Sequence, residues 1–205
     1  VMALSGLDVI LVEGDLRKPT MSSTFDIDPS HPGLSHLLVG AVSLESALVQ
    51  PSVPGLQVIP AGDPPPNPSE LLGSERMSDL VTYLASKHVV IIDAPAALPV
   101  TDAVALGAHT DGVLLVVRAG HTTDEQLEQV TEAIRQGGGS VFGVVLNQTP
   151  SSDRRRVEIG EAATAPLSTS PVRASSRQGA EPTGQRAVGW SAGAAAAGQM
   201  PVRAR

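Results

Sequence analysis

Five short apolar runs, rich in β-branched residues, divide the first 150 residues at regular intervals. They cover residues 9–12, 56–59, 89–92, 112–117 and 141–146. Three of them are almost continuously hydrophobic, which is typical of strands that helices cover on both faces. Helix signals lie between the runs. This alternation predicts an α/β fold with a doubly wound, mostly parallel sheet flanked by helices.

Two of the intervening segments begin with helix-capping residues. Asn67 precedes Pro68, an order that suits an N-cap followed by the first helical position, and we expect a helix from there to about Ser86. Residues 122–125 resemble a capping box, and the helix that follows should end at the glycines of 137–139.

The composition changes near residue 150. Residues 1–150 hold 6 basic and 17 acidic residues, whereas residues 151–205 hold 8 arginines, 4 acidic residues and only six Val, Ile or Leu. A segment with so little apolar surface does not offset the entropy of ordering its chain. We therefore expect a folded α/β domain over residues 1–150 and a low-complexity, disordered tail over 151–205.

The overall composition excludes several function classes. A pI near 5.1 argues against nucleic-acid binding, which requires a basic surface. Without cysteine, the chain has neither disulfides nor thiolate zinc sites, and its five histidines are scattered without metal-ligand spacing. No apolar run reaches the roughly 18 residues of a membrane span. The composition therefore favours a cytoplasmic protein, or a piece of a larger one.

Acidic residues follow two of the predicted strands. Glu13 and Asp15 come after residues 9–12, and Asp93 comes directly after residues 89–92. A carboxylate at the end of a buried strand is costly to desolvate, so it usually has a partner such as a metal ion or a helix N-terminus. Four apolar residues followed by Asp form a Walker B arrangement. Each signal alone is weak, but both together, beside Arg17 and Lys18, favour a nucleotide site.

The order of motifs resembles the bacterial tyrosine kinases, the kinase domains of polysaccharide co-polymerases within the P-loop NTPase superfamily. The resemblance rests on a Walker A′-like segment at residues 9–19, a Walker B-like segment at 89–95 and six further blocks, at residues 33–40, 58–62, 65–77, 98–103, 111–118 and 143–147. It implies that residues 1–150 form a truncated P-loop kinase-like domain. The block Pro-Asn-Pro-Ser-Glu-Leu-Leu at 66–72 distinguishes this family from cell-division and plasmid-partition ATPases, which share the sheet.

The resemblance implies ATP-dependent autophosphorylation on tyrosine by a non-specific protein-tyrosine kinase, linked to capsular or extracellular polysaccharide synthesis and export. It assigns catalytic roles to Asp15, Arg17 and Asp93, with Arg17 neutralising phosphate charge. Asp15 and Asp93 would hold Mg²⁺, directly or through water. Glu13, at the first acidic position of the motif, and Asn147, near the adenine, would contribute to cofactor binding.

The same resemblance implies partners and a location. A membrane polysaccharide co-polymerase or other kinase subunits, including copies of the same chain, are the expected partners, and nucleic acid is not. The expected location is the cytoplasm, at the inner face of the plasma membrane, through a partner or through a transmembrane segment that this sequence does not contain.

Two departures from the family pattern change what we expect of this chain. The phosphate-binding motif Gly-x-x-x-x-Gly-Lys-Ser/Thr is absent from the 205 residues, and residues 1–6 resemble the end of the helix that follows it. The only tyrosine, Tyr83, lies in a predicted helix, where packing is the expected role. We therefore expect a fragment with little ATP affinity of its own. A non-catalytic docking module and a partition-type ATPase remain alternatives.

Overall fold

The computed structural model describes residues 1–97 and 101–149, so the predictions for the tail lie outside the described residues. All five predicted strands are present, within a residue or two of the expected limits. They are β1 (Val9–Glu13), β2 (Leu56–Ile59), β3 (Val89–Asp93), β4 (Val113–Arg118) and β5 (Val141–Asn147). The α/β class predicted from the sequence is confirmed.

The helices between the strands are mostly short. A 3-10 turn at Ala3–Ser5 precedes β1, and the α-helices are α1 (Met21–Thr24), α2 (Leu34–Val39), α3 (Leu44–Ala47), α4 (Pro68–Leu72), α5 (Glu75–Ala85), α6 (Asp102–Gly107) and α7 (Asp124–Gln136). Within the described ranges, no helix is long and apolar enough to cross a membrane.

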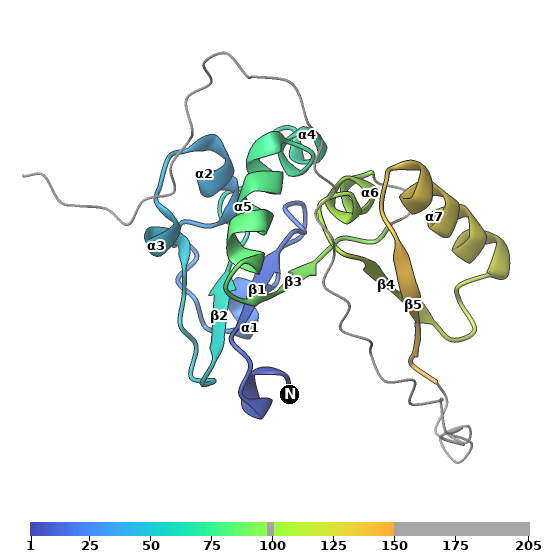
Figure 1. The fold of residues 1–205 in the computed structure, drawn as a ribbon, viewed down its shortest axis with the longest axis horizontal. Coiled ribbons are helices and arrows are strands. Elements are labelled where there is room, and N and C mark those ends of the chain that lie inside the picture. Colours follow the sequence, from blue (N-terminus) through green and yellow to red (C-terminus); the bar gives the residue numbers. More distant parts are fainter. Residues whose placement is uncertain (98–100, 150–205) are drawn as a thin grey trace, which may run out of the picture.

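The strands form two parallel sheets instead of one. The first has the order β2-β1-β3, and the second pairs β4 with β5. In the described part of the chain, no ladder joins β3 to β4, which is where a continuous sheet was expected. Figure 1 shows α5 lying across the first sheet and α7 alongside the second.

The main core lies around β1, the central strand of the larger sheet. Ile10 and Val12 of β1 belong to one buried cluster with Leu80 and Leu84 of α5 and residues of α2, α4 and α6. A smaller cluster joins Leu115 of β4 to the inner face of α7. The core therefore fixes β1 firmly, and with it the loop at its carboxyl end.

The helix expected over 67–86 is interrupted. It ends at Gly73 and restarts at Ser74, whose side chain accepts a hydrogen bond from the Met77 N–H at 3.3 Å. Asn67 occupies the N-cap position of α4, but its side chain makes no capping hydrogen bond and contacts Glu70 instead. The expectation of one helix capped by Asn67 was therefore wrong.

A capping box opens α7, but it lies one residue later than the expected 122–125, between Thr123 and Gln126. Thr123 Oγ1 accepts from the Gln126 N–H at 3.2 Å, and Gln126 Oε1 accepts from the Thr123 N–H at 3.1 Å. The helix then ends at Gly137, as the run of glycines predicts.

Candidate functional site

The candidate site is built on the aligned carboxyl ends of β1 and β3. The strands pair in parallel register, so Glu13 stands opposite Asp93. The β1 loop, residues 14–19, continues this contact because the Gly14 N–H donates to the Asp93 carbonyl at 2.8 Å. Two acidic segments that are 80 residues apart in the chain thus meet at one edge of the sheet.

Gly14 allows this close approach. A Cβ at this position would lie 2.8 Å from Leu106 Cδ1, 3.0 Å from the Asp93 carbonyl oxygen and 3.1 Å from Ile92 Cγ2. The carbonyl belongs to the backbone of β3 and cannot move aside easily. A side chain at residue 14 would therefore push the β1 loop away from β3.

Glu13 is a buried carboxylate with backbone partners. Its side chain is inaccessible to solvent, and it accepts hydrogen bonds from the N–H groups of Met21 at 2.7 Å, Ala61 at 3.0 Å and Thr20. Three such donors compensate the desolvation of the charge. This geometry gives Glu13 a structural role that ties β1 to α1 and to the segment after β2, while its predicted cofactor contact stays a prediction.

Asp15 is half-buried at the turn of the β1 loop. One carboxylate oxygen, Oδ1, accepts from the N–H groups of Arg17 at 3.1 Å and Lys18 at 2.9 Å. These local bonds orient the carboxylate within the loop. Because they use Oδ1 only, Oδ2 keeps its capacity to accept a further donor or a cation.

Asp93 lies in a field of negative charge. Burial raises the pKa of the Asp93 carboxyl, and the neighbouring carboxylates of Glu13 and Asp15 raise it further. A positive charge at this edge would relieve that repulsion. The electrostatics thus suit a cation close to Asp15 and Asp93.

The donor chemistry at this edge fits Mg²⁺ bound with a nucleotide. Mg²⁺ takes oxygen ligands and is commonly held by one or two carboxylates together with substrate phosphates and water. Within residues 1–97 and 101–149, no group of three or more His, Asp or Glu side chains is arranged to hold a metal by itself. Asp15 and Asp93 therefore suit a shared Mg²⁺–phosphate site better than a resident all-protein one.

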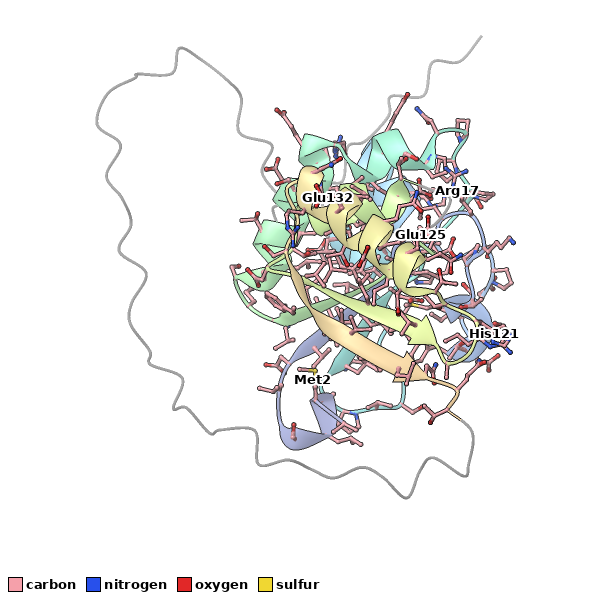
Figure 2. The ribbon with its side chains drawn as sticks, turned by 90° about the vertical axis from the view of Figure 1, so that its right-hand side faces the viewer. Met2, Arg17, His121, Glu125 and Glu132 are labelled. Atoms are coloured by element: carbon pink, nitrogen blue, oxygen red, sulfur yellow. The ribbon has the colours of Figure 1, made fainter. Side chains whose placement is uncertain are left out.

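Arg17 is engaged in an ion pair at the same edge. Its Nε lies 2.6 Å from Asp102 Oδ2 and its Nη2 lies 3.2 Å from Oδ1, so the guanidinium binds the carboxylate in a bidentate way. The Asp102 side chain is fully buried, whereas that of Arg17 is 43% exposed. Arg17 lies at the end of the fold opposite Met2 in Figure 2. Its predicted contact with phosphate stays a prediction.

Asp102 and Ser69 are site residues that the sequence reasoning did not single out. Ser69 lies in α4 and donates to Asp102 Oδ1, and Thr101 donates to Ser69 Oγ at 3.3 Å. The hydrogen bond from Arg17 is the main cause of the lowered pKa of the Asp102 carboxyl. Both residues belong to sequence blocks that carried the resemblance, but nothing in the spacing indicates their contact.

The remaining predicted residues lie elsewhere. Asn147 ends β5 in the second sheet, where it is exposed and its Oδ1 accepts from the Gln148 N–H at 2.8 Å. Among the described residues, no hydrogen bond joins Asn147 to the acidic residues of β1 and β3. Tyr83 is half-buried against the main core, and Lys87 Nζ donates to its hydroxyl at 3.1 Å. The packing role expected for Tyr83 is confirmed.

The chain is similar in sequence to tyrosine-protein kinases of several bacteria. The chain is 37% identical over 153 residues to the tyrosine-protein kinase ptk of Acinetobacter johnsonii, covering 74% of this chain and 21% of ptk. It is 36% identical to YwqD of Bacillus subtilis, covering 72% of this chain and 62% of YwqD. The crystal structure of the VpsO kinase domain superposes with a TM-score of 0.67 at 35% identity, over 71% of this chain and 72% of that one. No family model matches.

The chain therefore spans about a fifth of ptk and less than two thirds of YwqD. The cell-division ATPase MinD of Pyrococcus furiosus shares the fold, with a TM-score of 0.59, but at only 23% identity. The structural likeness thus extends to ATPases, while the higher sequence identity is to the kinases.

Proposed function

The chain belongs to the family of bacterial tyrosine-protein kinases of capsule and exopolysaccharide biosynthesis, and we propose that it is the partial kinase domain of an ATP-dependent tyrosine autokinase. Kinases of this family use ATP. The proposal rests on one observation: the β1 loop contacts the end of β3, so that Asp15 and Asp93 lie at the same edge of the sheet.

The arrangement suits phosphoryl transfer, which depends on positioning and charge neutralisation more than on covalent help from the protein. In this proposal Asp15 orients the acceptor hydroxyl and Asp93 lies near Mg²⁺. When bound, Mg²⁺ would neutralise charge on the β- and γ-phosphates. Burial and the neighbouring carboxylates of Glu13 and Asp15 raise the pKa of Asp93, and a bound cation would relieve this repulsion.

We further propose that these 205 residues bind ATP weakly by themselves. The Gly-x-x-x-x-Gly-Lys-Ser/Thr motif that cradles phosphates does not occur among them. Its absence removes several charge-assisted hydrogen bonds, each worth about 1.5–3 kcal/mol. Within the described residues, β3 and β4 each have one edge without a strand partner, whereas parallel sheets are usually continuous and covered.

The test is ATP-dependent phosphorylation of an added tyrosine-containing peptide by a chimera in which the phosphate-loop segment of YwqD is fused ahead of Val1; an added acceptor is used because Tyr83, the only tyrosine of the 205 residues, packs in the fold. We expect phosphotyrosine in the peptide, and loss of nearly all of it with Asp15→Asn and Asp93→Asn versions that have unchanged circular dichroism. Glu128→Gln, an exposed position on α7, is the control and should keep full activity. Retained activity in either aspartate variant would exclude its assigned role.

A docking role has one specific observation in its favour. By register, Leu114, Val116 and Val145 share one face of the β4–β5 sheet, and all three are exposed. An apolar face of this kind favours a partner, in this proposal a membrane co-polymerase or another kinase subunit at the inner face of the membrane. Size-exclusion chromatography with light scattering measures whether the chain forms a complex with an intact kinase. A chain that forms this complex, and whose chimera is inactive, supports docking alone.

A further inference from the structure

A hydrogen-bonded cluster joins the β1 loop to two helices at the candidate site. It consists of Arg17, Asp102, Ser69 and Thr101, and we call it the Asp102 clasp. Asp102 lies at its centre with a fully buried side chain, and it accepts hydrogen bonds from Arg17 on both oxygens and from Ser69 on Oδ1. The cluster thus connects the β1 loop, α4 and the start of α6.

The clasp is more than a surface ion pair. Exposed pairs contribute little to stability because water screens them. Here one partner is inaccessible to solvent, and its charge is matched by the planar fork of an arginine and by a serine hydroxyl. In agreement with this geometry, the pKa of the Asp102 carboxyl is lowered.

Arg17 links the clasp directly to Asp15. Its backbone N–H donates to Asp15 Oδ1 at 3.1 Å, while its side chain is held by Asp102. The neighbouring Lys18 N–H donates to the same oxygen at 2.9 Å. A displacement of the Arg17 side chain therefore disturbs the two hydrogen bonds that orient the Asp15 carboxylate.

The β1 loop is consequently fixed at both ends to the same region of the chain. At its start, the Gly14 N–H binds the carbonyl of Asp93 at 2.8 Å, and at its far side Arg17 binds Asp102. Asp93 and Asp102 lie on either side of the segment between β3 and α6. The two attachments hold the loop in one position relative to both.

We propose that Arg17 is a positioning residue, which through Asp102 and Ser69 sets the orientation of the Asp15 carboxylate at the acidic edge of the sheet. The geometry of the clasp stands on its own, while its meaning for phosphoryl transfer rests on the proposed function. Arg17 thus acts on the site through Asp15, whether or not its guanidinium also contacts phosphate.

The test is amide hydrogen exchange measured by NMR on the 205-residue chain. In Arg17→Ala and Asp102→Asn, we expect the amides of residues 17 and 18, which donate to Asp15, to exchange at least about tenfold faster relative to the intrinsic rate of each sequence. The Gly14 amide is the internal control, because its partner is the backbone of β3, and it should keep its rate. Arg135→Ala, which breaks an exposed pair with Glu132 on α7, is the matched arginine control and should change neither.

Further variants separate positioning from general loosening of the fold. The double variant should exchange no faster than either single one, since both remove the same link. Arg17→Lys keeps the charge without the bidentate geometry, so the amides of residues 17 and 18 should be better protected from exchange than in Arg17→Ala. This variant replaces Asp102→Asn if the latter does not fold. Unchanged exchange at Arg17 and Lys18, or equal acceleration at Gly14, overturns the proposal. An inactive YwqD chimera with an intact exchange effect would contradict the proposed function and leave the clasp standing.

Discussion

The three carboxylates at the edge of the larger sheet differ in what surrounds them. Glu13 is buried with three backbone N–H partners, and Asp15 is half-buried with two. Asp93 has a raised pKa, caused first by burial, and its side chain has no hydrogen-bond partner among the described residues. Environment, not residue type, therefore separates their roles. Glu13 stabilises the fold, whereas Asp15 and Asp93 keep capacity for a ligand.

Glu13→Gln should lower the stability of the chain in the absence of any ligand. The substitution places an NH2 group where backbone N–H groups now donate, which leaves at least one buried donor unpaired at a cost of about 1–3 kcal/mol. Urea unfolding measures the loss, with the exposed Glu128→Gln as the control of equal chemistry. An unchanged midpoint for Glu13→Gln would show that its carboxylate is not structural.

Asp93→Asn should instead raise the stability of the chain near neutral pH. Because the pKa of Asp93 is raised in the folded state, folding favours the protonated carboxyl over the charged one. The folded state therefore has its full stability at low pH and loses part of it as the pH rises through the raised pKa. The neutral amide avoids the loss, so the variant should melt slightly higher than the parent at pH 7, by about 1–2 °C given the exposure of the site. The difference should shrink toward roughly pH 4, as Asp93 takes up its proton. A lower melting temperature at pH 7 would mean that Asp93 has a stabilising partner.

At the scale of the elements, the strands were easier to predict than the helices. The parallel strands β1 and β4 both appear as nearly continuous apolar runs in the sequence, which sufficed to locate them, although β1 is buried and β4 is largely exposed. The helices α1 and α3 have four residues each, too few to show an amphipathic period. The break at Gly73 was missed because residues on both sides of it favour a helix.

Ser74→Ala should be more costly than Asn67→Ala. Ser74 caps α5 through the Met77 N–H, whereas the Asn67 side chain caps nothing. Loss of an N-cap costs typically about 1 kcal/mol, which lowers the melting temperature of a domain of this size by about 2–4 °C. Thermal unfolding of the two variants checks this order, and equal melting temperatures would contradict the assigned caps.

Part of the candidate site was predictable because its acidic residues follow strands that the sequence locates. Glu13, Asp15 and Asp93 follow strands, and the carboxyl ends of parallel strands meet at one edge, so their proximity could be expected from the sequence. The pairing of Arg17 with Asp102 joins residues 85 positions apart through side chains alone. No spacing or period signals such a contact, and the structure was needed to show it.

For the molecule as a whole, the division of the sheet is the main departure from expectation. The strands β3 and β4 each pair on one side within the described ranges, and exposed apolar residues such as Leu114, Val116 and Leu146 line the smaller sheet. A complete doubly wound fold would bury these positions. The exposed surface agrees with the limited span of the chain in its relatives, which extend well beyond the matched region.

The most direct test of this account is thermal unfolding of the 205-residue chain with and without millimolar Mg-ATP, with YwqD as the positive control. Binding at 100 times Kd would stabilise the chain by about 2.7 kcal/mol, a shift of several degrees. The account predicts a shift for YwqD and none for this chain, because its acidic edge lacks a phosphate-binding loop. A clear shift for the chain would contradict the account and show that Asp15, Asp93 and their neighbours bind the nucleotide without that loop.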